Sequence, residues 1–565
     1  MEKTHIKVGL LILIIISLTY QSVAQLSHRD TTLLWNHFDY VLDENNGMAS
    51  YSTTNIVGEY YTGVVIENEF VRLVILPEFG ARIISFYYKP TGHEQFYTNP
   101  VGTPYGMGDG NFYYDWLMVM GGIFPTFPEP EHGKTWFLPW QWEFTEISSD
   151  RITIKMQLKD TISYPGHPGK FNNGVTEIQC ITSVSLQKGN TCFEFNHIIQ
   201  NTKSETQPFE YWTCATLAPG SETGNTFTPA NSEIIAPIEY VYLKDNWWSW
   251  MGNAENPAYG QGNHVFKYEN LAFYDNWEDM GIAYAHPAIE ENYYGVINHE
   301  NSEGVFRVAD NVNITSGMKF WTWGAEQGLN ANPENFYHTA RPYIELWSGL
   351  STQFFEDAYL LPNEIISWTE TYLPTVNMDS ITYVNENGAI FLGHENDDSE
   401  NFLVKLFNTI PNTEFDLEVS LNGLSVANLF DGSYISDSKI SSQFRFYLND
   451  FIIEDGDYIL NAKVYDQNEE LVIESSIPVT IPYSYDDIIN TSISKPKVYR
   501  ISEFACKFEF DKSAIRNLAV FSINGQLLQQ HSITDNSAVI QVNKAGLYIF
   551  RIEEGNRSYS VKMIF

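Results

Sequence analysis

The sequence predicts an all-β protein made of several sandwich domains. Helical periodicity is almost absent, whereas apolar and polar residues alternate with period two in many short runs. Glycine, asparagine, aspartate and proline separate these runs, as expected for strands joined by turns. Clear runs occupy residues 72–76, 151–158, 176–186, 191–200 and 343–347.

The N-terminus has the features of a secretory signal peptide. Lys3 and Lys7 precede an uncharged apolar run, and Ser22 and Ala24 stand at the small-residue positions of a cleavage site. The apolar run is too short to span a bilayer comfortably. We therefore expect a signal peptide over residues 1–24 and no membrane span in the mature chain.

Three units are expected after this signal. Residues 25–375 form a large unit that is dense in tryptophan, whereas residues 376–483 contain no tryptophan. The second stretch holds about seven strands, which suits an immunoglobulin-like β-sandwich. Residues 484–494 are expected to form a linker, and residues 495–565 a small C-terminal β-sandwich.

Charge and composition limit the possible partners. The chain has 32 basic and 70 acidic residues, a net charge of −38. Nucleic acids and anionic membranes require clustered lysine and arginine, so we expect no nucleic-acid partner. Aromatic residues make up 15% of the chain, with 14 Trp and 35 Tyr. All-β cores use many aromatics, but this excess also favours a carbohydrate ligand, because aromatic faces stack on sugar rings.

The last unit resembles the C-terminal sorting domain of the type IX secretion system. The resemblance rests on "FSINGQLLQQ" and on "AGLYIFRIEEGNRSYSVKMIF", with Lys562 close to the end. Its strands are expected over residues 518–521, 527–530, 538–542, 547–552 and 558–565. The resemblance implies a partner, the type IX secretion machinery, and export through the periplasm and outer membrane to the cell surface or medium. A plain terminal binding module is the alternative.

The large unit resembles galactose-mutarotase-like domains. In "VVIENEFVRLVILPEFGARIISFYYK" a Gly-Ala pair precedes Arg82 and a second strand, and "GGIFPTFPEPEHGKTWFLPWQWEF", with His132 and Trp142, resembles a segment of aldose and hexose-phosphate epimerases. "KFWTWG" and "ARPYIELWSGLSTQFFEDAYLLPNEIISWTETYLP" resemble secreted members of that superfamily. The resemblance implies a two-sheet β-supersandwich over most of residues 60–375.

This resemblance implies acid–base chemistry of the aldose epimerase type. Interconverting anomers needs one group that takes the proton from the anomeric hydroxyl and another that protonates the ring oxygen. A carboxylate and an imidazole suffice, with no metal or cofactor. The resemblance points to Glu345 as the base and His132 as the imidazole partner. It also points to Arg82 as a residue that binds a hydroxyl or an anionic group.

Neighbouring residues extend the candidate site. In "YIELW", Tyr343, Glu345 and Trp347 share one face of a strand, which is more typical of a cleft than of a solvated edge. The candidate substrate-binding residues are Arg82, His338, Arg341, Trp212, Trp248 and Trp323. Each candidate also has a purely structural interpretation, as a surface carboxylate or histidine, a paired arginine or a core aromatic.

One departure from the family pattern keeps other functions open. Mutarotases carry a second histidine on a later strand, where this chain has Trp212, Thr213 and Cys214. His197, further upstream, is equally consistent with a core position. The general acid is therefore not identified from the sequence.

Three functions remain after this comparison of motifs. The first is an exported epimerase-type enzyme. The second is a glycan-cleaving enzyme. A lyase could use Tyr337, His338 and Arg341, whereas a glycoside hydrolase would need two carboxylates. The candidate carboxylates are Glu78, Glu129, Glu131 and Glu345. The third is a non-catalytic glycan-binding surface protein.

Overall fold

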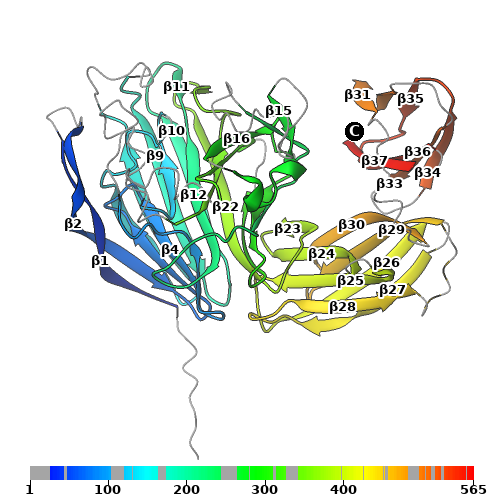
Figure 1. Cartoon of the computed structure of the whole chain (residues 1–565), viewed down its shortest axis with the longest axis horizontal. Helices are drawn as coiled ribbons and strands as arrows, with labels where there is room; N and C mark the ends of the chain where they lie inside the picture. Colours follow the sequence, from blue (N-terminus) through cyan, green and yellow to red (C-terminus); the bar gives the residue numbers. More distant parts are fainter. Residues whose placement is uncertain are drawn as a thin grey trace, which may run out of the picture.

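The computed structural model confirms an all-β architecture (Figure 1). The structure describes residues 26–42, 48–102, 120–129, 132–162, 174–243, 264–278, 280–289, 291–309, 314–325, 341–395, 398–423, 426–448, 451, 453, 456–481, 496–502, 504–510, 516–522, 527–554 and 557–565. Within these ranges the helical elements are two short 3-10 turns, η4 (Tyr268–Asn270) and η5 (Tyr274–Asn276). No helix in the same ranges is long and apolar enough to cross a membrane.

The first layer of the large unit is a broad antiparallel sheet. Within the described residues it contains twelve strands, ordered β1-β2-β3-β4-β5-β12-β20-β19-β16-β14-β15, with β6 paired to β12 and β4. The strands are β1 (Ser27–Leu42), β2 (Met48–Glu67), β3 (Val71–Leu76), β4 (Arg82–Tyr88), β5 (His93–Phe96), β6 (Ile123–Thr126), β12 (Trp212–Ser221), β14 (Tyr240–Tyr242), β15 (Val265–Lys267), β16 (Gly281–His286), β19 (Gly317–Thr322) and β20 (Ile344–Gly349).

The second layer is an eight-stranded sheet, ordered β13-β17-β18-β22-β10-β9-β8-β7 in the described part of the chain. Its strands are β7 (Gln141–Ile147), β8 (Arg151–Lys159), β9 (Ile178–Gln187), β10 (Phe193–Asn201), β13 (Glu233–Ile235), β17 (Tyr293–Asn298), β18 (Glu303–Ala309) and β22 (Ile365–Val376). A small ribbon of β11 (Gln207–Phe209) and β21 (Ala358–Leu360) lies beside the two layers.

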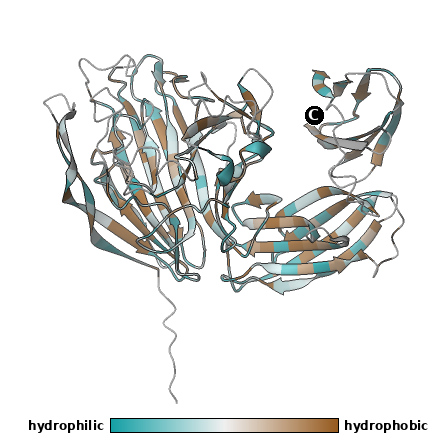
Figure 2. Cartoon of the chain, viewed as in Figure 1, coloured by the Kyte–Doolittle hydropathy of each residue, from teal (hydrophilic) through white to brown (hydrophobic). Residues whose placement is uncertain are grey.

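The central strands β12, β19 and β20 of the twelve-stranded sheet are buried on both faces, and this burial positions the site. Successive side chains of a strand point to opposite faces. Ile344 and Leu346 of β20 therefore join the main core between the two sheets. Tyr343 and Trp347 join a second, aromatic cluster on the other face. Figure 2 shows how apolar and polar residues are interspersed along the strands of the large unit.

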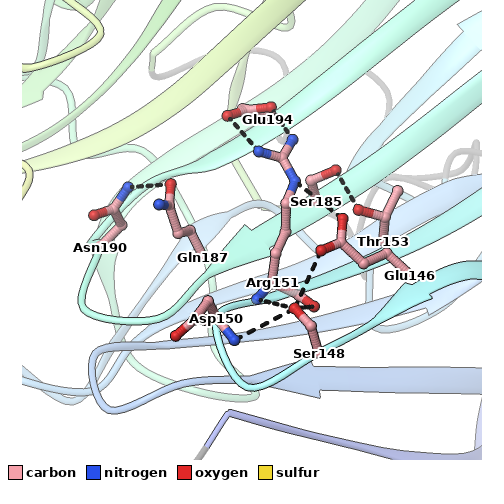
Figure 3. A network of polar contacts seen from close by, with 9 residues as sticks. All are labelled: Glu146, Ser148, Asp150, Arg151, Thr153, Ser185, Gln187, Asn190 and Glu194. Atoms are coloured by element: carbon pink, nitrogen blue, oxygen red, sulfur yellow. Dashed lines mark hydrogen bonds and ion pairs between the residues drawn. The ribbon is translucent and has the colours of Figure 1, made fainter.

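The outer face of the eight-stranded sheet is an ordinary solvated surface. Figure 3 shows Arg151 of β8 reaching Glu194 of β10 and lying 3.9 Å from Glu146. Thr153 and Ser185 share a hydrogen bond of 2.9 Å beside them. Because Arg151 and both carboxylates are about a third or more exposed, water screens these ion pairs and each contributes little to stability.

The next unit is a sandwich of two four-stranded sheets. Its strands are β23 (Tyr383–Asn385), β24 (Gly388–Glu395), β25 (Asp398–Asn408) and β28 (Ser442–Tyr447) in one sheet, and β26 (Glu414–Gly423), β27 (Val426–Ile435), β29 (Gly456–Tyr465) and β30 (Leu471–Ile481) in the other. The boundary between the large unit and this sandwich lies between the end of β22 at Val376 and the start of β23 at Tyr383.

The C-terminal unit is a smaller two-sheet sandwich that lies beside β29 and β30 (Figure 1). Its strands are β31 (Lys497–Ser502), β32 (Ala505–Glu509), β33 (Arg516–Ser522), β34 (Leu527–Ile533), β35 (Ser537–Gln541), β36 (Leu547–Glu554) and β37 (Arg557–Ile564). These strands agree with the five expected from the sequence. Across the contact with the neighbouring sandwich, Arg551 lies 2.7 Å from Asp457 and donates to Thr480 at 3.0 Å.

Several sequence predictions lie outside the described residues. These are the signal peptide, the linker over 484–494, and the candidates His338, Trp248, Tyr337 and Glu131. The four cysteines are all described, and each is buried and free.

Candidate functional site

Strand β20 places a carboxylate at the centre of the aromatic face. Glu345 lies between Tyr343 and Trp347 on that face, as the alternation in the sequence predicts. Its neighbours in register are Thr216 of β12 and Trp321 of β19. The carboxylate is thus held in the middle of the sheet, with a paired strand on either side.

Three further polar groups converge on the same face. Arg82 comes from β4, Lys319 from β19, and His132 from the loop that follows β6. The relative exposures are 4% for Glu345, 1% for Arg82, 3% for Lys319 and 6% for His132. Because charged groups are rarely buried without a function or a partner, this cluster is the candidate active site.

Trp347 connects three of these groups. Its indole Nε1 donates a hydrogen bond to Oε2 of Glu345 at 2.7 Å. The His132 ring stacks against the indole with centroids 5.9 Å apart and 20° between the planes. Nζ of Lys319 lies 3.7 Å from the centre of the same ring system, a cation–π contact. One indole therefore holds the carboxylate, the imidazole and the ammonium group together.

The carboxyl group of Glu345 titrates near neutral pH. Burial raises its pKa to about 7, and the opposing charges of Lys319 and Arg82 and the bond from Trp347 only partly reverse this effect. A carboxyl group with such a pKa accepts and releases protons at physiological pH, as a general acid–base catalyst must.

His132 is buried, and the interpretation as a surface histidine is therefore wrong. The turn that carries it is fixed by a bridge between Phe127 and Gly133. It is also fixed by Lys134, whose Nζ lies 3.2 Å from Asp160. Burial, followed by the charges of Lys319 and Arg82, holds the pKa of His132 well below its usual value. The imidazole is therefore neutral at physiological pH.

The alternative interpretation of Arg82, as an arginine paired with a carboxylate, is wrong. Its Nη1 donates to the carbonyl of Gly121 at 2.5 Å, and the guanidinium lies 3.7 Å from the ring centre of Phe124. Within the described residues it forms no ion pair, and its Nε has no hydrogen-bond partner. Burial lowers its pKa to about 9.

The candidate aromatic residues line the same face. Trp323 packs edge-on to Trp321 with centroids 4.5 Å apart, and Tyr343 stacks on Tyr97 at 4.0 Å. Trp212 is fully buried and packs against Phe354 at 5.1 Å. The structure thus brings Trp323 and Trp212 to the same aromatic cluster as Tyr343 and Trp347.

The remaining candidates lie at the margin of the cluster or elsewhere. Arg341 is exposed, and its backbone N–H donates to the hydroxyl of Tyr97 at 3.3 Å. Glu78 accepts a hydrogen bond from the backbone of Thr62 at 2.7 Å, and Glu129 is buried in the segment that leads to His132.

His197 lies in the core between the two sheets. Its ring stacks on Trp368 with centroids 4.8 Å apart, and Nδ1 shares a 2.6 Å hydrogen bond with Tyr211. Since Glu345 projects from the opposite face of the twelve-stranded sheet, His197 is not the missing general acid.

A buried ion pair of the eight-stranded sheet connects that sheet to the strands of the site. Nη2 of Arg307 on β18 lies 2.9 Å from Glu370 on β22. Ser348 of β20 and Thr213 of β12 donate to the same carboxylate at 2.7 and 3.3 Å. The pair therefore fastens both central strands of the site to the second sheet.

Lys319 is not among the site residues predicted from the sequence, although the strand pattern around it indicates its position. In "KFWTWG" the period of two places Lys319, Trp321 and Trp323 on one strand face. A lysine on the same face as two tryptophans is a cation in an aromatic cluster, not a solvated side chain.

In the described ranges, no group of three or more His, Cys, Asp or Glu side chains is arranged to hold a metal ion.

Two family profiles match the chain. One, described as "Domain of unknown function (DUF5107)", matches residues 45–374, which is more than half of the chain. The other, described as "Secretion system C-terminal sorting domain", matches residues 502–565. The chain therefore carries the type IX sorting domain and is exported to the cell surface or the medium.

Several solved structures resemble the chain at low sequence identity. A TPR-domain containing protein from Parabacteroides distasonis is 16% identical, with a TM-score of 0.49, over 64% of this chain and 57% of that protein. A galactose mutarotase-like protein from Clostridium acetobutylicum is 12% identical, with a TM-score of 0.39, over 61% of this chain and 99% of that protein. A galactose mutarotase related enzyme from Lactobacillus acidophilus is 14% identical, with a TM-score of 0.35, over 57% and 100%.

Proposed function

Since the chain belongs to the DUF5107 family of domains of unknown function, we propose its function from the site itself: acid–base catalysis on a carbohydrate outside the cell. The single observation that carries this proposal is the buried carboxyl group of Glu345, whose pKa of about 7 suits proton transfer at neutral pH. The surrounding tryptophan and tyrosine rings suit the faces of a sugar.

The leading reaction is interconversion of sugar anomers by ring opening. Glu345 takes the proton from the anomeric hydroxyl while the bond between the anomeric carbon and the ring oxygen breaks. The ring oxygen gains a proton, which Glu345 returns, so that one carboxyl group performs both transfers that two separate groups were expected to share, because the pKa of His132 is too low for an imidazolium acid. The open-chain aldehyde then closes on either face. The neutral imidazole of His132 donates a hydrogen bond to the ring oxygen, and Arg82 binds a neighbouring group of the sugar.

Anomeric equilibration of purified aldoses, followed by polarimetry or NMR, tests this reaction. We expect Glu345→Gln to slow it at least about a hundredfold, the range found for a lost general base. The rate of the unaltered protein should rise with pH around a midpoint near 7, because only the ionised carboxylate accepts a proton.

Glu94 offers a matched control for this test. It is also buried, its pKa is also raised by burial to about 7, and Ser85 donates to it at 2.9 Å. Glu94→Gln should leave the rate unchanged. Full activity in the Glu345→Gln variant would rule out the proposed role of this carboxylate.

Lyase cleavage of an acidic glycan is a second candidate, favoured by the cations near the site. Such a reaction needs a base beside a cation that neutralises a uronate. His132 is a candidate base, and the charge of Arg82 acts on it. Hydrolysis is less well supported, because it needs two carboxylates. Glu345 projects into the aromatic cluster, and a second buried carboxyl group at this cluster, that of Glu210, already accepts a hydrogen bond from the backbone N–H of Phe355 at 3.0 Å.

A glycan panel separates the remaining functions. New reducing ends without ultraviolet absorbance indicate hydrolysis, and absorbance from an unsaturated uronate indicates a lyase. Binding that is lost in Trp323→Ala, with no turnover of any glycan, would indicate a non-catalytic sugar-binding protein.

A further inference from the structure

The charge of the site is opposite to that of the whole chain. The protein carries a net charge of −38. On the aromatic face, however, the charges of two cationic side chains, Arg82 and Lys319, act on one carboxyl group whose pKa is about 7. Burying a guanidinium such as that of Arg82 without a carboxylate partner costs free energy.

Arg82 differs from the other buried arginine of this unit. Arg307 is matched by Glu370 at 2.9 Å, so its charge is neutralised inside the protein. Arg82 is equally buried, yet no carboxylate of the described residues lies within ion-pair distance. Its Nε has no hydrogen-bond partner, as is also true of Nε and Nη1 of Arg307, so the missing carboxylate is what distinguishes the two arginines. Arg82 contacts the carbonyls of Gly121 and Trp136 and the rings of Phe79 and Phe124. A guanidinium with a spare donor binds planar anionic groups well.

Lys319 supplies a second charge from another direction. Its ammonium group lies 3.7 Å from the Trp347 ring and 4.3 Å from the Phe354 ring. The charges of Arg82 and Lys319 both act on Glu345 and on His132, so the two cations surround the proposed reaction centre.

We infer that the ligand is an acidic sugar, whose carboxylate or sulfate group is bound by Arg82 and Lys319. This inference rests on the proposed function, because it names the substrate class of the same site. An anionic group of the sugar beside Arg82 and Lys319 would compensate their positive charge. It would also accept a charge-assisted hydrogen bond from the Nε–H of Arg82.

Binding of matched oligosaccharides by the full chain tests the inference. Titration calorimetry would compare a uronic-acid oligosaccharide, a neutral oligosaccharide of the same linkage, and its sulfated form. We expect either acidic form to bind about thirtyfold or more tighter than the neutral one. Comparing the uronic-acid oligosaccharide with the sulfated one shows whether the site prefers a carboxylate or a sulfate group.

Two variants assign the preference to the two cations. Arg82→Gln and Lys319→Met should each reduce binding of the acidic sugar toward that of the neutral one. Arg72→Gln removes the same charge at a guanidinium that lies 4.3 Å from the Tyr87 ring, and should have no effect. If Arg82→Gln does not fold, Lys319→Met alone decides the test.

The outcomes separate this inference from the proposed function. Equal or tighter binding of neutral sugars, with turnover that depends on Glu345, would overturn the acidic-sugar inference and leave the catalytic proposal standing. Absence of both binding and turnover with every sugar class would overturn both. An acidic preference unchanged in both variants would contradict the assignment to Arg82 and Lys319.

Discussion

At the scale of single residues, Glu345 is costly for the folded protein to keep ionised. Its pKa is about 7 in the folded state against 4.5 for an exposed glutamate side chain. The folded state therefore binds more protons between these two values, and stability falls as pH rises through that window. We predict that Glu345→Gln is more stable than the unaltered protein at pH 8, by up to about 3 kcal/mol.

Urea unfolding at pH 4 and pH 8 checks this prediction. At pH 4 the carboxyl group is mostly protonated in both states, so the two proteins should differ little. An equal gain at both pH values would show that packing, not ionisation, explains the difference.

The Arg307–Glu370 pair has the opposite pH dependence. Burial alone would raise the pKa of Glu370, but the charge of Arg307 dominates and lowers it to about 2. This group thus stabilises the protein above its unfolded pKa, and the contribution is lost as pH falls from about 4.5 toward 2. Glu370→Gln should cost roughly 3–5 kcal/mol at neutral pH, because it leaves Arg307 buried and unpaired.

Denaturant unfolding of Glu370→Gln and of an Arg307→Met/Glu370→Leu double variant measures this cost. The double variant should recover much of the loss, since it removes the unpaired charge. A double variant no more stable than the single one would contradict this account.

At the scale of elements, strand periodicity made the centre of the site predictable. Alternation in "YIELW" is enough to predict that Glu345 shares a face with Tyr343 and Trp347. The same rule applied to "KFWTWG" would have found Lys319. The burial of His132 and the unpaired state of Arg82 could not be predicted, because they depend on loops packed across strands that are distant in sequence. For the same reason His197 could not be assigned to the core rather than the site.

The turn that carries His132 gives a prediction at this scale. Gly133 has φ of +76°, and a Cβ atom there would lie 2.3 Å from the backbone nitrogen of Phe127. Gly133→Ala should therefore shift the turn, displace His132 from Trp347 and lower turnover. Turnover and thermal unfolding would be measured together.

Gly189→Ala is the matched control for the turn. Gly189 has φ of +80° with no atom within 4 Å of the added Cβ, so the variant carries backbone strain without a clash. It should cost about 1 kcal/mol of stability and leave turnover intact. Equal effects on turnover in both variants would mean that strain alone, not the position of His132, is responsible.

At the scale of the whole molecule, the C-terminal unit makes a small contact with the rest of the chain. An apolar group of Ile459, Phe521 and Ile549 and the contacts of Arg551 with Asp457 and Thr480 join it to the neighbouring sandwich. Among the described residues, the aromatic cluster around Glu345 contains none from the C-terminal unit. The site and the sorting signal therefore occupy separate cores.

This separation predicts that export and chemistry can be uncoupled. Deleting residues 495–565 should leave turnover and the unfolding of the large unit unchanged, because the removed unit shares no core with the site. The same deletion should retain the protein in the periplasm, since the type IX sorting domain is lost. Cell fractionation and turnover of the truncated chain measure the two effects separately. A truncated protein that still reaches the medium would show that the signal lies elsewhere, and a loss of turnover would show that the C-terminal unit supports the site.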